Sequence, residues 1–297
     1  MKNFILAARP KTLLAGVIPP CVAHVYFMFT HKESEPVYLL LCVLGALFIQ
    51  LATNFFNDVI DHEKGADAVR VGPTRVSASG LVDLKTVRRW AKTCVVLGML
   101  CGIPLIVRGG LPFLVLGLLS LYLTYGYTGG KASLAYRGLG ELFVFLFFGL
   151  FSVVGAYYLF ALEVNAGAFI LASMFGCLAT TFICINNLRD RDQDKVVGKM
   201  TLATKYSVSD YRRFILLTIF QPYALLFFFN TAGPLILVCY LGLIPAVRLA
   251  KIVYQETGSG LNLGLKFSGI HLVVFSLLLS FTFIYESLLQ SVPTHAP

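Results

Sequence analysis

The sequence N54-F-F-N-D58-V-I-D61-H-E63-K-G-A-D67 places four acids within 14 residues, directly after an apolar stretch at 37–57. That stretch is long enough to cross the roughly 30 Å hydrocarbon core of a bilayer. On a helix, Asn54, Asp58 and Asp61 are spaced i, i+4, i+7 and share one face. Acids at the end of a membrane span are uncommon, so this run predicts a functional site at a helix end.

A second run, N186-N-L-R-D190-R-D192-Q-D194, holds three acids in nine residues and follows another apolar stretch at 166–186. Asn186, Asp190 and Asp194 are spaced i, i+4, i+8, again on one helix face. Both runs read Asn-x-x-x-Asp, then a further Asp one turn on, then a basic stretch that contains glycine. This correspondence indicates an internal repeat whose two helix ends face each other across a central cavity.

The composition places both runs in a membrane protein. Of the 297 residues, 57% are hydrophobic and 13% are charged, which excludes a disordered chain and an ordinary soluble enzyme. We expect an all-α polytopic membrane protein, a single domain over 1–297, with about nine transmembrane helices around a central cavity. The candidate helices are 13–30, 37–57, 90–107, 111–128, 139–161, 166–186, 214–230, 232–250 and 268–289.

The basic residues are concentrated on one side of these predicted spans. The segments 1–12, 58–89, 129–138, 187–213 and 248–267 hold 21 of the 24 Lys and Arg, whereas only Lys32 and Arg108 fall on the opposite side. By the positive-inside rule, the amino terminus and the long loops are cytoplasmic, and an odd number of helices puts the carboxyl terminus outside. The net charge of +9 therefore reflects topology and attraction to anionic lipid. Without a basic stripe interleaved with aromatics, nucleic acid is not expected as a partner.

The seven cysteines lie within or beside predicted spans and form no CxxC pair, so we expect neither a disulfide framework nor a metal-thiolate site.

Several carboxylates that converge at one place repel each other unless cations neutralise them. Oxygen ligands of this kind suit Mg²⁺, which is often shared with substrate phosphates, and nearby Lys and Arg suit the phosphate oxygens. Taken alone, Glu63 or Arg70 is explained equally well by an ordinary polar loop. The paired, helically phased acids favour a site for a diphosphate with a long hydrocarbon tail. The bases beside the two runs are Lys64, Arg70, Arg75, Arg189, Arg191, Lys195 and Lys199.

Motifs over the first two thirds of the chain resemble those of the UbiA-type membrane prenyltransferases. Within that family they are most similar to the branch that prenylates 1,4-dihydroxy-2-naphthoate in menaquinone synthesis. The matching strings are A8-R-P-K-T12, N54-F-F-N-D-V-I-D61 with G65-A-D67, G72-P-T-R75, S79-G-L81, Y127-T-G-G130, R137-G-L-G-E141, and N186-N-L-R-D190 through D194 to G198-K-M-T-L-A203.

The resemblance implies nine helices around a cavity that opens at the cytoplasmic side of the cell inner membrane. It also implies a role for each residue in the motifs. Two Mg²⁺ ions would be held by Asp58, Asp61, Asp190 and Asp194. The prenyl diphosphate would be bound by Asn54, Arg75, Lys131, Asn187, Arg189 and Lys199, and the catalytic residues would be Asp67, Tyr127 and Lys131. The aromatic acceptor would be bound by Arg9 and Lys11, which are equally explained by topology.

The expected reaction begins with ionisation of the prenyl diphosphate to an allylic carbocation, helped by Mg²⁺ and nearby bases. The electron-rich ring of the acceptor then attacks. With dihydroxynaphthoate, the carboxylate leaves as CO₂ and demethylmenaquinone results. Aromatic faces near the motifs could stabilise the cation, although core packing is the favoured explanation for each of them. These rings belong to Phe55, Phe56, Tyr122 and Tyr125.

Three other functions can be compared with the sequence. The acceptor could be 4-hydroxybenzoate, homogentisate, or a porphyrin or haem. A CDP-alcohol phosphotransferase needs an Asp-Gly-x-x-Ala-Arg string, and none follows Asp61. A cation-coupled transporter would carry its acids near mid-membrane, whereas these acids follow the predicted spans.

Overall fold

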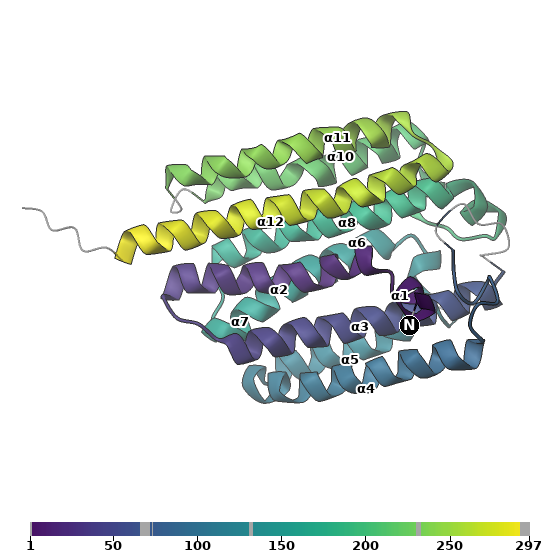
Figure 1. The fold of residues 1–297 in the computed structure, drawn as a ribbon, viewed down its shortest axis with the longest axis horizontal. Helices are drawn as coiled ribbons and strands as arrows, with labels where there is room; N and C mark the ends of the chain where they lie inside the picture. The colour runs from purple at the N-terminus through teal and green to yellow at the C-terminus, as the bar shows by residue number, and fades with distance from the viewer. Residues whose placement is uncertain (1, 66–71, 73, 131–132, 230–232, 292–297) are drawn as a thin grey trace, which may run out of the picture.

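The computed structural model describes residues 2–65, 72, 74–130, 133–229 and 233–291. Every regular element within these ranges is a helix, and the long helices lie side by side along one axis (Figure 1). The all-α fold expected from the composition is therefore confirmed. The predicted residues Asp67, Arg70 and Lys131 lie outside the described residues.

The chain forms α1 (Lys2–Ala8), α2 (Pro10–His31), α3 (Pro36–Glu63), α4 (Leu84–Gly109), α5 (Leu111–Gly126), the 3₁₀ turn η1 (Leu134–Tyr136), α6 (Gly140–Val144), the π-helical η2 (Phe145–Val154), α7 (Gly155–Ala161), α8 (Ala166–Val196), α9 (Leu202–Lys205), α10 (Val208–Leu225), η3 (Leu226–Phe228), η5 (Pro234–Gly242), α11 (Leu243–Gln255), η6 (Gly258–Gly260) and α12 (Leu261–Ser291). Side-chain caps begin several of them: Asp83 accepts from the Thr86 amide and Asn165 from the Ala168 amide, each at 2.9 Å.

Seven helical segments within the described residues are long and apolar enough to cross a membrane. Of the nine predicted spans, α5 and α10 fall outside this set. The apolar α5 has only 16 residues, and α10 begins with the polar turns around Asp210 and Arg213. In contrast, α3 and α8 continue past their predicted ends to Glu63 and Val196. Both acidic runs therefore lie on helices, as their spacing requires.

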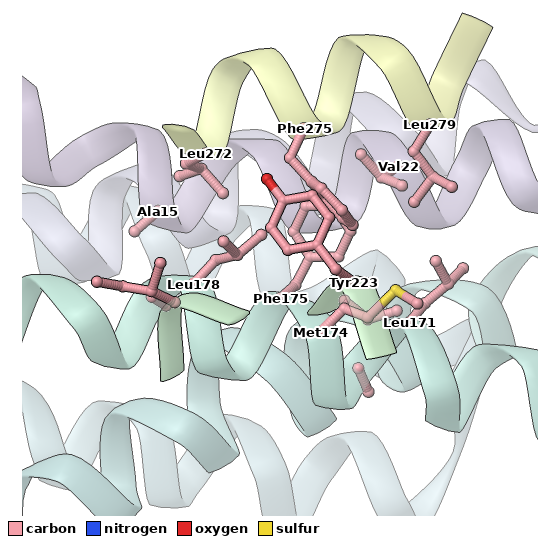
Figure 2. Packing of buried hydrophobic residues seen from close by; sticks show 14 of the residues in the cluster. Ala15, Val22, Leu171, Met174, Phe175, Leu178, Tyr223, Leu272, Phe275 and Leu279 are labelled. Atoms are coloured by element: carbon pink, nitrogen blue, oxygen red, sulfur yellow. The ribbon is translucent and has the colours of Figure 1, made fainter. Parts of the chain in front are cut away.

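The most enclosed span is α8, with 72% of its apolar window buried against 22% for α4. Its buried face meets α2, α10 and α12 in the larger of two apolar cores (Figure 2). At the centre, the ring of Phe275 lies 6.2 Å from that of Phe175 and 5.3 Å from that of Tyr223. Because α8 also carries the second acidic run, this core fixes the position of that run.

The π-helical segment η2 packs closely against α8 at two glycines, Gly149 of η2 and Gly176 of α8. A Cβ on Gly149 would meet the Ala172 carbonyl oxygen at 2.4 Å, and one on Gly176 would meet the Phe145 ring at 2.8 Å. π-Helical turns are rare and often occur at functional sites. Here the segment turns Phe147 and Phe148 toward the cavity described below.

A smaller core holds the short amino-terminal helix α1, which the sequence did not predict. Phe4 of α1 packs against Phe55 of α3 and Trp90 of α4, at ring distances of 5.3 and 5.1 Å. This contact holds the chain start beside the first acidic run.

Candidate active site

A cavity of about 840 Å³ lies between α2, α3, α5, α6–η2 and α8. Both acidic runs contribute to its wall, as the internal repeat predicts. Phe143, Phe147, Phe148 and Phe182 are among the apolar residues that line it. The polar and charged residues from the two runs are Asn54, Asn57, Asp61, Asn186, Asn187, Arg189 and Asp190.

Three acids of the runs form ion pairs with three of the predicted diphosphate-binding bases. Arg75 Nη2 lies 2.8 Å from Asp61 Oδ2, and Lys199 Nζ lies 3.3 Å from Asp194 Oδ1. The guanidinium of Arg189 donates to both oxygens of Asp190 at 2.7 Å. Removing one partner from such shielded pairs would leave a costly uncompensated charge. The acids and bases predicted to act together are thus assembled at one place.

Asp58 and Asp194, two of the predicted metal ligands, are not among the residues that line the cavity. Asp58 is 1% exposed, and its Oδ1 accepts from the Ser77 amide at 3.0 Å, which anchors the loop after α3. Asp194 is also buried, and its Oδ2 has no hydrogen-bond partner within the described part of the chain. In this arrangement the first run presents Asp61, and not Asp58, to the cavity.

The described residues contain no group of three or more His, Cys, Asp or Glu side chains arranged to hold a metal. The donors at the cavity nevertheless fit Mg²⁺ chemically. Asp61 and Asp190 line the same cavity and offer oxygen ligands, and Asp194, one turn after Asp190 on α8, has an oxygen without a hydrogen-bond partner among the described residues.

Tyr136 connects the two runs, and the sequence analysis missed it. Its hydroxyl donates to Asp61 Oδ1 of the first run at 3.4 Å, and Lys64 Nζ lies over its ring at 4.1 Å. On the side of the second run, Lys199, which pairs with Asp194, has its Nζ 5.9 Å from the ring centroid. Burial, together with the negative charges of Asp61 and Asp194, raises the pKa of Tyr136, so this hydroxyl stays protonated. Its place directly before the R137-G-L-G-E141 string was the available signal, but no local pattern shows which acid it meets.

Arg9, in the turn between α1 and α2, and Lys11, in the first turn of α2, both line the cavity. Asn54 holds this turn, because its Nδ2 donates to the Ala8 carbonyl at 2.9 Å and to the Thr12 hydroxyl at 3.4 Å. Arg9 has a left-handed backbone, with φ of 53°, which costs roughly 1–2 kcal/mol for a residue with a Cβ. The A8-R-P-K-T12 string thus has a structural reason: it brings two bases to the cavity in a strained turn fastened by the first run.

Tyr127, Asn187 and Glu141 form the wall on the side of α6. Burial raises the pKa of Tyr127, and the nearby carboxylates of Glu141 and Asp61 raise it further, so it remains a phenol. Asn187 Nδ2 donates to Glu141 Oε1 at 2.9 Å. Of the predicted site residues, Asp67 and Lys131 lie outside the described residues, Asp58 and Asp194 do not line the cavity, and the others line it.

Comparison with known proteins decides the family. The sequence profile described as the UbiA prenyltransferase family matches residues 17–268, most of the chain. The chain belongs to the UbiA prenyltransferase family. It is therefore a prenyltransferase of the UbiA type.

Two bacterial relatives of this UbiA protein are each named 1,4-dihydroxy-2-naphthoate octaprenyltransferase. The protein from Haemophilus influenzae is 32% identical and that from Escherichia coli 33% identical, each over 213 residues that cover 69% of both chains. The matched region is about two thirds of the chain, the same share that carries the motifs.

Solved structures show the same fold at low identity. A UbiA homolog from Archaeoglobus fulgidus bound to GPP and Mg²⁺ superposes with a TM-score of 0.63 at 15% identity, covering 95% of this chain and 99% of that one. An apo UbiA homolog from Aeropyrum pernix K1 gives a TM-score of 0.67 at 14% identity, with coverage of 89% and 96%. The all-helical polytopic fold around a cavity is therefore that of the UbiA proteins.

Proposed function

We propose that this protein transfers a polyprenyl group from a prenyl diphosphate to 1,4-dihydroxy-2-naphthoate, with loss of CO₂, to give a prenylated naphthalene-diol, which is the reduced form of demethylmenaquinone. The observation that carries the acceptor is the identity of 32–33% with two dihydroxynaphthoate octaprenyltransferases over 69% of each chain. The cavity supports it, since Arg9 and Lys11 provide cations for an acceptor carboxylate beside the two acidic runs.

Mg²⁺ is the proposed cofactor. Asp61, Asp190 and Asp194 would hold it, and Asp58, whose Oδ1 accepts from the Ser77 amide, remains a predicted ligand. Bound there, the metal would neutralise charge that develops on the diphosphate leaving group.

The bases of the site are proposed to bind the diphosphate oxygens. Arg75, Arg189 and Lys199 already lie against the carboxylates of the two runs. Asn54 and Asn187 line the same cavity and would also bind the diphosphate. Lys131 keeps its predicted roles in diphosphate binding and catalysis, and Asp67 keeps its predicted catalytic role. The phenol of Tyr127, kept protonated by burial, would donate a hydrogen bond at the cavity.

The cavity mouth is proposed to face the cytoplasm from a bacterial-type inner membrane, with the carboxyl terminus outside. The basic loops support this orientation, because 21 of 24 Lys and Arg fall in segments that would share one side. The acids support an enzyme over a transporter, since Asp61 lies two residues before the end of α3 and Asp194 two before the end of α8.

The test uses the purified full chain in nanodiscs with Mg²⁺ and farnesyl diphosphate. Dihydroxynaphthoate and 4-hydroxybenzoate are offered side by side, and products are identified by mass. We expect a decarboxylated prenyl naphthalene-diol from the first acceptor, and a product from the second alone would overturn the acceptor assignment. Asp190→Asn should abolish transfer, whereas the matched control Asp192→Asn, whose side chain is 95% exposed, should retain it.

A further inference from the structure

Glu141 is the one cavity-lining acid of the described residues that has no basic partner. Its side chain belongs to the α6 wall and is only 2% exposed. Oε1 accepts two hydrogen bonds, from Asn187 Nδ2 at 2.9 Å and from the Tyr211 hydroxyl at 2.7 Å. Oε2 is buried and has no hydrogen-bond partner in the described part of the chain.

The Glu141 carboxylate, with one oxygen hydrogen-bonded and the other without a partner among the described residues, differs from the other acids that line the cavity. Asp61 and Asp190 are each paired with an arginine, and those pairs are accounted for by the diphosphate site. An ionised carboxylate can accept about four hydrogen bonds, and leaving a buried polar atom unsatisfied costs roughly 1–3 kcal/mol. A buried oxygen without a partner, on a residue that lines a cavity, is therefore suited to a ligand that donates a proton or a hydrogen bond.

The chemistry of the two proposed substrates identifies that donor. A prenyl diphosphate presents acceptor oxygens and a hydrocarbon chain, so it has no group that would donate to a carboxylate. The aromatic acceptor carries ring hydroxyls, and a hydroxyl is both a donor and an acid. The neighbours of Glu141 in the wall, Phe143, Val144 and Ile183, are apolar and suit the face of a ring.

We propose that Glu141 Oε2 accepts a hydrogen bond from a ring hydroxyl of the aromatic acceptor and takes its proton as the ring attacks. This inference rests on the proposed function only in requiring a hydroxylated aromatic acceptor. It makes Glu141 the general base of the carbon–carbon bond-forming step.

The step balances as follows for a hydroxynaphthoate. The C–O bond of the prenyl diphosphate breaks and its electron pair leaves with the diphosphate. The ring carbon that bears the carboxylate forms a bond to the prenyl carbon, while the hydroxyl proton moves to Glu141 and that hydroxyl becomes a ketone. Loss of CO₂ returns its bonding pair to the ring, the ketone oxygen takes the proton back from Glu141, and the carboxylate is restored.

Glu141→Gln is the direct test, because it keeps Oε1 as the acceptor for Asn187 and Tyr211 but replaces Oε2 with an amide that donates. General bases contribute about 10²–10⁴-fold, so we expect kcat for prenyl transfer to fall at least about 100-fold with KM for farnesyl diphosphate unchanged. The matched control is Glu163→Gln, an exposed acid paired with His31, which should leave turnover unchanged.

If Glu141 had only a positioning role, the variants would show different kinetic effects. If it only orients Asn187 toward the diphosphate, Tyr211→Phe should damage transfer as much as Glu141→Gln does, and KM for farnesyl diphosphate should rise. Either of these results, or transfer by Glu141→Gln within threefold of the parent, overturns the proposal.

A second measurement does not depend on the folding of the variant. The unmodified protein is offered acceptors in which one ring hydroxyl at a time is a methyl ether, and one of the ethers should lose turnover as strongly as Glu141→Gln does. Equal turnover of all the ethers and the parent acceptor overturns the proposal. Transfer to 4-hydroxybenzoate but not to dihydroxynaphthoate would defeat the proposed function alone, and the Glu141 comparison would then be made with the hydroxybenzoate.

Discussion

Gly149→Ala tests whether the cavity wall depends on the backbone contact between η2 and α8. The new Cβ would lie 2.4 Å from the Ala172 carbonyl oxygen and 2.6 Å from the Gly176 Cα, whereas ordinary contact begins at 3.4 Å. Both obstacles are backbone atoms, so no side-chain rotation relieves the overlap, and the helices would have to separate by about 1 Å in a close-packed interior. Overpacking of this kind costs about 1–3 kcal/mol.

The matched control is Gly102→Ala in α4, where the new Cβ would meet no described atom within 4 Å apart from its chain neighbours and the backbone of its own helix. Alanine is favoured over glycine in helix interiors by up to about 1 kcal/mol, so this control should be neutral or slightly stabilising. At roughly 2–4 °C per kcal/mol, Gly149→Ala should lower the Tm of the purified protein by roughly 2–12 °C. Its prenyl transfer should also fall, because η2 carries Phe147 and Phe148 of the cavity wall. Equal melting temperatures for the two variants would refute the reasoning.

Three further outcomes are expected. Asp58→Asn keeps an oxygen for the Ser77 amide but loses its charge, so turnover should fall by more than roughly 100-fold at an unchanged Tm; full activity would restrict Asp58 to anchoring the loop. Asn54→Ala leaves the Ala8 carbonyl without its donor, which should cost about 1–3 kcal/mol in a melting experiment and raise KM for the acceptor by loosening the Arg9 turn; an unchanged KM would separate that turn from acceptor binding. Chelation by EDTA should stop transfer and added Mg²⁺ should restore it, and transfer that persists in EDTA contradicts the metal site.

The features that the sequence predicted are those that local spacing determines. The i, i+4 periodicity of both acidic runs indicated helices, and both runs do lie on helices, α3 and α8. The basic residues placed next to them, among them Arg75 and Lys199, are the bases that pair with Asp61 and Asp194. Ion pairs between neighbouring segments follow from charge and proximity, which a single sequence records.

The features that the sequence did not predict depend on contacts between distant residues. Asp58 fits the helical pattern as well as Asp61 does, yet the Ser77 amide from the following loop engages it. Tyr136 lies 75 positions from Asp61 in the chain and nevertheless donates to it. The open oxygen of Glu141 depends on Tyr211, 70 positions away, which occupies the other oxygen. Periodicity assigns a residue to a helix face, but only packing decides which partner that face meets.

The pairing of charges in the cavity explains how an apolar protein accommodates these charged side chains when no substrate is bound. The described cavity wall carries six bases against three acids, a formal surplus of three positive charges suited to a diphosphate. The bases are Lys2, Arg9, Lys11, Arg75, Arg189 and Lys199. Because Asp61 and Asp190 already have partners, binding of a diphosphate would exchange the partners of charges that are already desolvated, and would not require new charges to be buried. Glu141 has no basic partner in the described part of the chain and takes no part in this exchange. Its Oε2, which has no hydrogen-bond partner among the described residues, therefore suits a neutral donor and not a cation.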